Sequence, residues 1–333
     1  MFSGSISSIC KTLHGQLTSI DLSSNKLAGD VPNCWDKTPN LVSLNLANNR
    51  FWGEIPRSFG SLHGLNVLQL RGNSLSGEFP STLRRCQELV FVDVAGNELA
   101  GEIPTWIGEI SDLEFLNLGT NKFHGSIPSE ICNLTAILIL DFSRNNLDGI
   151  IPDCFNNLTL MTQRNIPADL NCAGVVLSLS YNDNLPNHVN IRYYEFSSIQ
   201  WKGRESEYRK NLELLKLIDF SSNKLSGNIP QSFTNMKGLI SLNLSSNRLT
   251  GNILSHIGDM EMLECLDLSS NQLSGKIPTT LAQLQYLSVL ICRTTICMEK
   301  FQRALNSKAS MHLLMPRIRG FVGPLSRYAP KIA

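Results

Sequence analysis

Residues 113–128 read LEFLNLGTNKFHGSIP, and variants of this pattern recur every 24 residues along much of the 333-residue chain. Nine asparagines mark the recurrence: Asn25, Asn49, Asn73, Asn97, Asn121, Asn145, Asn223, Asn247 and Asn271. A glycine follows each asparagine four residues later, and a proline follows eight of the nine seven residues later. This spacing indicates an array of equivalent units, each of which can bury its apolar side only against its neighbours.

Each position of the repeat has a physical role. Apolar and polar residues alternate before the asparagine, as from Leu116 to Leu118, which predicts a short strand with one buried face. We expect the asparagine amide to bond to backbone groups where the chain leaves the strand, and the glycine to allow a positive φ or close approach at a turn. Proline in nearly every unit excludes an α-helical repeat, because an interior proline costs a helix about 3 kcal/mol. The prediction is an α/β-type repeat, a right-handed solenoid with a parallel β-sheet on its concave face.

The second half of the repeat, L-x-G-x-I-P, resembles the plant-specific class of leucine-rich repeats. More narrowly, residues 29–35 (GDVPNCW) and 201–208 (WKGRESEY) resemble the ectodomains of plant receptor-like proteins of the fungal-xylanase (EIX) receptor type. The resemblance covers about residues 1–290. It implies a leucine-rich-repeat horseshoe on the extracellular side of the plasma membrane, which recognises an extracellular protein or peptide. It also implies defence signalling through partner receptor kinases, because such receptors have no kinase of their own.

The repeats predict two arrays, at residues 1–159 and 211–290, separated by an insertion at residues 160–210 that abandons the pattern. A disordered insertion is one interpretation. Four aromatic side chains within residues 193–201 favour the other, in which the insertion packs on the solenoid. Receptor-like proteins of the family carry an island domain at this place.

The insertion also contains a pattern similar to the family's Tyr-x8-Lys-Gly motif, formed by Tyr193, Lys202 and Gly203, with Trp201 beside it. By resemblance, these residues dock a co-receptor kinase of the SERK type, and an adaptor receptor kinase is a further expected partner. Tyrosine and tryptophan suit such a role because they combine a large apolar area with a polar group.

The C-terminal tail, residues 291–333, differs in net charge from the rest of the chain. Residues 291–333 hold eight basic residues against the single acid Glu299, whereas residues 1–290 hold 21 basic and 27 acidic residues. The net negative charge of residues 1–290 does not favour binding to nucleic acid. We expect the basic tail to be a disordered, non-repeat segment, either foreign to the receptor sequence or regulatory. The chain lacks an N-terminal signal peptide and an 18-residue apolar run, so against the family pattern it is expected to be truncated at both ends.

The concave face offers a candidate ligand site. The residue six before each asparagine should point outward there, which predicts an exposed apolar stripe of Val67, Phe91, Phe115 and Ile139. Contiguous exposed apolar patches often mark ligand contacts. The alternatives are that single exposed apolar residues are ordinary, or that the insertion covers them. The neighbouring column, four before each asparagine, is polar throughout and adds Asp93 and Asn117 to the candidates.

Catalytic chemistry is not indicated. The chain has no G-x-S-x-G, P-loop, G-x-G-x-x-G or H-E-x-x-H motif, and its six histidines stand at no ligand spacing. We therefore predict no enzyme activity, no metal and no cofactor. The alternative function is a soluble secreted inhibitor of a microbial cell-wall-degrading enzyme, similar to polygalacturonase-inhibiting proteins, although those inhibitors run uninterrupted repeats.

Cysteines and sequons fit an extracellular protein. Cysteine pairs occupy nearly the same phase of adjacent repeats and should stack as neighbours, close enough for a bridge. These pairs are Cys10 with Cys34, and Cys132 with Cys154. We predict two disulfides, the alternative being four buried thiols. N-glycosylation sequons stand at Asn133, Asn157 and Asn243.

Overall fold

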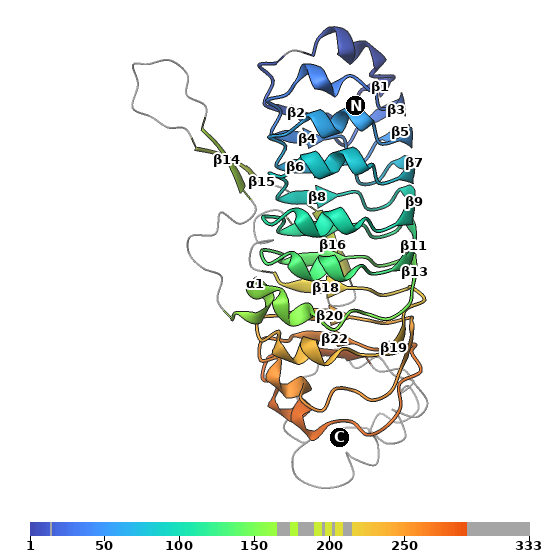
Figure 1. The fold of residues 1–333 in the computed structure, drawn as a ribbon, viewed down its shortest axis with the longest axis vertical. Helices are drawn as coiled ribbons and strands as arrows, with labels where there is room; N and C mark the ends of the chain where they lie inside the picture. The colour runs from blue at the N-terminus through green and yellow to red at the C-terminus, as the bar shows by residue number, and fades with distance from the viewer. Residues whose placement is uncertain are drawn as a thin grey trace, which may run out of the picture.

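The computed structural model describes residues 1–13, 15–164 and 215–291 in full, and between them only the backbone of four strands. The described residues wind as one elongated array from the N-terminus to residue 291 (Figure 1). Each turn contributes one short strand to a ten-stranded parallel sheet. Its strands are β2 (Ser19–Asp21), β4 (Ser43–Asn45), β6 (Val67–Gln69), β8 (Phe91–Asp93), β10 (Phe115–Asn117), β12 (Ile139–Asp141), β18 (Leu217–Asp219), β20 (Ser241–Asn243), β22 (Cys265–Asp267) and β23 (Val289–Ile291). The predicted solenoid with a parallel sheet is confirmed.

A second parallel sheet, which the sequence analysis did not predict, runs along the other edge of the array in Figure 1. Its seven strands are β1 (Ser3–Gly4), β3 (Lys26–Asp30), β5 (Arg50–Glu54), β7 (Ser74–Glu78), β9 (Glu98–Glu102), β11 (Lys122–Ser126) and β13 (Asn146–Asp148). Beyond the insertion it continues only as β19 (Ser226–Asn228) paired with β21 (Arg248–Thr250), and as single bridges. The repeat glycine has a positive φ of 73° to 99° in all nine repeats, and in the first five (Gly29, Gly53, Gly77, Gly101 and Gly125) it lies within a strand of this sheet rather than in a turn.

Short helical turns return the chain from the second sheet to the first. They are the 3-10 helices η1 (Ser7–Lys11), η2 (Trp35–Lys37), η3 (Arg57–Ser61), η4 (Ser81–Arg85), η5 (Thr105–Glu109), η6 (Ser129–Asn133), η7 (Phe155–Asn157), η9 (Gln231–Asn235), η10 (Ile257–Asp259) and η11 (Thr279–Gln283), and the α-helix α1 (Thr159–Thr162). Six of the 3-10 helices begin directly after the repeat proline, whose fixed φ suits the first residue of such a turn and which needs no donor there.

The repeat asparagine joins each turn to its neighbours, as expected. The Nδ2 of Asn97 donates to the carbonyl oxygens of Leu70 (3.1 Å) and Val94 (3.0 Å), and its Oδ1 accepts from the backbone N–H of Leu75 at 3.0 Å. Without these bonds, the buried backbone groups would each cost about 1–3 kcal/mol. The same contacts recur from turn to turn, so they form a continuous ladder beside a leucine-rich core.

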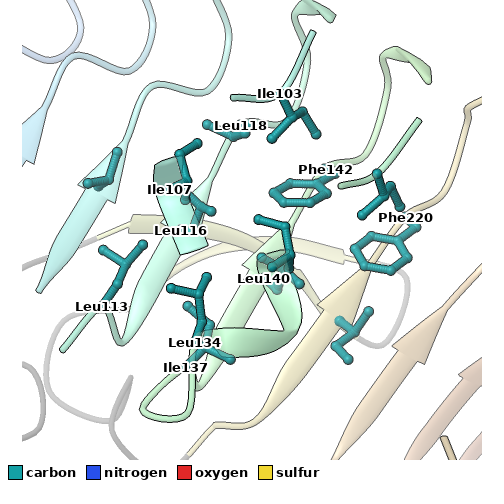
Figure 2. Packing of buried hydrophobic residues seen from close by; sticks show 14 of the residues in the cluster. Ile103, Ile107, Leu113, Leu116, Leu118, Leu134, Ile137, Leu140, Phe142 and Phe220 are labelled. Carbon is teal, nitrogen blue, oxygen red and sulfur yellow. The ribbon is translucent and has the colours of Figure 1, made fainter. Parts of the chain in front are cut away.

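The array continues across the insertion without a break. Strand β12 pairs directly with β18, and the backbone N–H of Leu147 donates to Oδ1 of Asn223 at 3.0 Å, although 76 residues separate them. Phe142 and Phe220 stack at this seam with ring centroids 5.5 Å apart (Figure 2). The ring centroid of Phe155 lies 5.8 Å from that of Phe220, so a third aromatic ring packs at the seam. Aromatic packing therefore adds to the strand pairing and the asparagine hydrogen bond that join the two halves.

The described part of the insertion consists of two antiparallel hairpins. The first pairs β14 (Gly174–Ser178) with β15 (Asn190–Tyr194), and the second pairs β16 (Ser197–Trp201) with β17 (Arg204–Tyr208). Tyr193 stands opposite Val175 and Trp201 opposite Arg204, so the two candidate docking aromatics belong to different hairpins. Lys202, Gly203 and the predicted tail after residue 291 lie outside the described residues.

Candidate ligand-binding site

The fold brings the predicted concave stripe together. Val67, Phe91, Phe115 and Ile139 occupy the first positions of β6, β8, β10 and β12 and are aligned with one another across the sheet. The rings of Phe91 and Phe115 stack with centroids 4.0 Å apart. These side chains belong to an apolar cluster that is separate from the main core.

The predicted exposure of the stripe is wrong. Val67, Phe91, Phe115 and Ile139 are only 1–4% exposed, and Asp93 and Asn117 only 1–2%. Leu160, at the start of the insertion, and Leu215, just before β18, belong to the same cluster. Toward the two ends of the polar column burial decreases, since Asp21 is exposed and Asp267 half-buried. These six side chains are therefore shielded from solvent, and a ligand cannot reach them in this structure.

Two carboxyl groups meet in the same polar column. Asp141 and Asp219 stand opposite each other on β12 and β18, at the seam. Asp219 accepts hydrogen bonds from the Ser221 N–H (2.8 Å) and from Nδ2 of Asn243 (2.9 Å). Burial, reinforced by the negative charge of Asp141, raises the pKa of Asp219 to about 7, and burial also raises the pKa of Asp141. The pair therefore favours a protonated state inside the array.

The open polar surface lies instead on the second sheet. Glu54, Glu78 and Glu102 end the strands β5, β7 and β9, and their side chains are exposed. They line a groove of about 950 Å³ between these strand ends and the helical turns that follow. The sequence analysis did not consider these residues. The signal was available, because the residue after the repeat glycine is acidic in four consecutive repeats, beginning with Asp30.

The cysteine and sequon predictions have different outcomes. Both disulfides, Cys10–Cys34 and Cys132–Cys154, are confirmed, and in each pair the Cα atoms are 5.8 Å apart. Asn133 and Asn157 are exposed at the ends of η6 and η7, so a glycan could be attached to either. Asn243 is half-buried on β20, and its Nδ2 donates a hydrogen bond to the carboxylate of Asp219. This third sequon is therefore poorly placed for modification.

Comparison with known proteins identifies the repeat. One family profile described as leucine rich repeat matches residues 39–99. A second profile of the same description matches residues 16–37, 112–134, 137–158, 214–236, 238–260 and 262–284. The chain belongs to the leucine-rich-repeat family. Within the described residues, no helix of this leucine-rich-repeat chain has the length and apolar character needed to cross a bilayer.

Several of the similar proteins are plant receptors. Receptor-like protein EIX2 of Solanum lycopersicum is 60% identical over 40 residues, which are 12% of this chain and 4% of that protein. The ectodomain of the Arabidopsis thaliana receptor kinase GASSHO1/SCHENGEN3, solved with CASPARIAN STRIP INTEGRITY FACTOR 2, is 29% identical, with a TM-score of 0.68. The alignment covers 87% of this chain and 28% of that one.

A third similar structure is the Arabidopsis receptor kinase HAESA in complex with the peptide hormone IDA and the co-receptor SERK1. It is 25% identical with a TM-score of 0.50, and the alignment covers 86% of this chain and 47% of that one. The chain thus spans less than half the length of each of these three proteins. Its leucine-rich repeats correspond to part of an ectodomain of this type.

Proposed function

We propose that the chain is the ligand-recognition part of the ectodomain of a plant cell-surface receptor-like protein, which acts in defence signalling through partner receptor kinases. The observation that carries this proposal is the likeness of nearly the whole described array to ectodomains of plant receptor kinases. The short stretch of high identity to a receptor-like protein points the same way. The ligand would be an extracellular protein or peptide.

Extracellular chemistry supports this location. Disulfides persist mainly in oxidising compartments, and two of them close neighbouring turns of the array. Exposed sequons at Asn133 and Asn157 suit a secreted glycoprotein. We place the chain on the outer side of the plasma membrane, within a longer receptor.

The proposed partners are a co-receptor kinase of the SERK type and an adaptor receptor kinase. A SERK1 co-receptor is present in the similar HAESA complex. In this chain, Tyr193, Trp201, Lys202 and Gly203 are the proposed docking residues, of which Tyr193 and Trp201 lie on β15 and β16.

The test is association of the secreted full chain with the ectodomain of a SERK-type co-receptor, measured by biolayer interferometry with and without a purified fungal xylanase. We expect association that the double variant Tyr193→Ala, Lys202→Ala weakens at least fivefold. Tyr286→Ala, which removes an exposed aromatic ring far along the array, is the matched control. Equal binding by the double variant and the wild type would remove the motif from the proposal.

An inhibition assay with a fungal polygalacturonase tests the alternative function. If the chain inhibits that enzyme and associates with no co-receptor, the receptor proposal is wrong and the chain is a secreted inhibitor.

A further inference from the structure

The seam joins the first half of the array, residues 1–164, to the second half, residues 215–291. The N–H of Phe142 donates to the carbonyl oxygen of Asp219 at 2.8 Å, and Nδ2 of Asn223 donates to the carbonyl oxygen of Phe142 at 2.9 Å. One turn earlier, an ordinary junction has the same two bonds, at 2.8 Å and 3.0 Å. The contacts themselves, rather than a short connection in the chain, therefore hold the two halves in register.

Aromatic rings fill the interior of the seam. Phe142 and Phe155 of the first half contact Phe220 and Phe233 of the second half, with ring centroids 5.0 to 5.8 Å apart. All four side chains are fully buried, and aromatic side chains buried in this way dominate the energetics of cores and interfaces. Neither disulfide of the described residues crosses the seam. Packing, hydrogen bonds and an ion pair are thus the described contacts that join the halves.

The last described residues of the first half, 159–164, run along the side of the second half. The carbonyl oxygen of Gln163 accepts a hydrogen bond from Nζ of Lys216 at 2.6 Å. Arg164 forms an ion pair with Glu261, which lies one turn beyond the turn adjacent to the seam. Both side chains of this pair are partly exposed, so the pair itself contributes little energy. Its position nevertheless shows that the first half reaches past its immediate neighbour, which enlarges the contact between the halves.

Gly238 leaves the room that this segment needs. Its N–H donates to the carbonyl oxygen of Met161 at 3.0 Å, and a Cβ atom placed on it would collide with the carbonyl oxygen of Gln163. At Gly64, which holds the same repeat position in the first half, such a Cβ would meet no described atom within 4 Å. Other turns have larger residues at this position, namely Glu88, Asp112 and Met262. The repeat does not require a glycine there, whereas the passage of residues 159–164 does.

We propose that the seam is a self-sufficient interface, so that the two halves remain one assembled array when the chain is cut within the insertion. A linker between two binding surfaces acts mainly by raising their effective concentration. Cutting it removes that contribution and leaves the contacts of the seam in place. Proteolytic processing of the insertion therefore changes the insertion without dismantling the array. The inference goes beyond the proposed receptor function and does not depend on the ligand or the co-receptor.

The test is cleavage of a full chain that carries the recognition sequence of a site-specific protease between Asp183 and Asn184, in the connection from β14 to β15. After cleavage, a non-reducing denaturing gel should show two fragments. Size-exclusion chromatography should show one peak at the elution volume of the uncut chain, and the circular dichroism spectrum should not change. With the chain immobilised through its N-terminus, surface plasmon resonance then measures how fast the second half is released.

An asparagine pair tests whether the contacts of the seam control this release. Asn223→Ala removes two hydrogen bonds that cross the seam, and should accelerate release by about tenfold or more, because the buried backbone partners are left unsatisfied. Asn247→Ala is the matched control, since it removes the same two bonds one turn later, within the second half. It should leave the release rate close to that of the wild type.

A glycine pair tests the contribution of residues 159–164. Gly238→Ala should accelerate release by about tenfold, because its Cβ displaces the segment that passes over it. Gly64→Ala, the matched control, adds the same methyl group in open space. Neither glycine has a positive φ, so the two substitutions differ in the contacts of the new Cβ and not in backbone strain.

The proposal has clear ways to fail. Two peaks after cleavage of the wild type, or a changed circular dichroism spectrum, would show that the halves need the connecting chain. A single band on the non-reducing gel would show that a covalent bridge holds them. Equal release rates for Asn223→Ala and Asn247→Ala would show that the seam does not control assembly. Spectra of the uncut variants identify any that fail to fold, and in that case the glycine pair supplies the same comparison.

Discussion

The turns before and after the insertion have the same interior and different exteriors. Both halves share the ten-stranded sheet, the asparagine ladder and the leucine core. The first half alone has a seven-stranded second sheet, an acidic groove and the two disulfides of the described residues. The recurring leucine and asparagine positions therefore specify the same first sheet, hydrogen-bond ladder and core in both halves, whereas the residues between those positions vary from turn to turn.

The seam between the halves is the most sensitive point. Phe220→Ala removes a fully buried ring that contacts Phe142 and Phe155, and should cost about 3–5 kcal/mol of unfolding free energy. Because stability in such arrays is a sum of unit and interface terms, the later turns should then open separately. Hydrogen exchange should report faster exchange in residues 217–291 than in residues 19–141.

Leu244→Ala is the control for this prediction, since Leu244 holds the same repeat position one turn later and is fully buried. It should destabilise the later turns without separating the halves. Uniformly faster exchange along the whole array in Phe220→Ala would contradict the special role of the seam.

The disulfides should act on the first half only. The double variant Cys132→Ser, Cys154→Ser opens a bridge with a sequence separation of 22, for which the loop-entropy estimate is about 3 kcal/mol. Exchange should accelerate in the turns around η6 and η7, and the later turns should change less. The corresponding variant of Cys10 and Cys34 opens a loop of similar length at the first turn, so its effect should appear there instead. Equal losses in both halves would show that the array unfolds as one unit.

The sequence predicted what depends on the repeat. Leu116, Asn121 and the two cysteine pairs have roles that follow from their phase, and the structure places them accordingly. The second sheet was missed because Gly125, with φ of 76°, was taken as a turn residue although it lies within β11. The sequence of a single repeat does not indicate that the residues around its glycine pair in parallel with strands of the neighbouring repeats to form that sheet.

The exposure of the concave face could not be predicted for a different reason. Whether Phe91 and Phe115 meet solvent depends on residues that are distant in sequence, such as Leu160 and Leu215. A repeat pattern describes one turn and the next, but not contacts made by residues outside the repeat. The meeting of Asp141 and Asp219 likewise requires the seam to close across the insertion.

That carboxyl pair should make stability depend on pH. The pKa of Asp219 in the folded chain is about 7, above its usual value, so the folded state binds more protons than the unfolded state between about pH 4 and pH 7. Stability should fall as the pH rises through this window. Asp141→Asn removes the neighbouring charge, lowers the pKa of Asp219 and should flatten the dependence by about 1 kcal/mol.

Thermal unfolding measured from about pH 4 to pH 8 tests this expectation. Asp21→Asn is the matched control, because Asp21 occupies the same repeat column at the exposed end of the array and accepts the Ser23 N–H at 2.8 Å. A wild-type melting temperature that is constant or rises over this range would contradict the predicted direction.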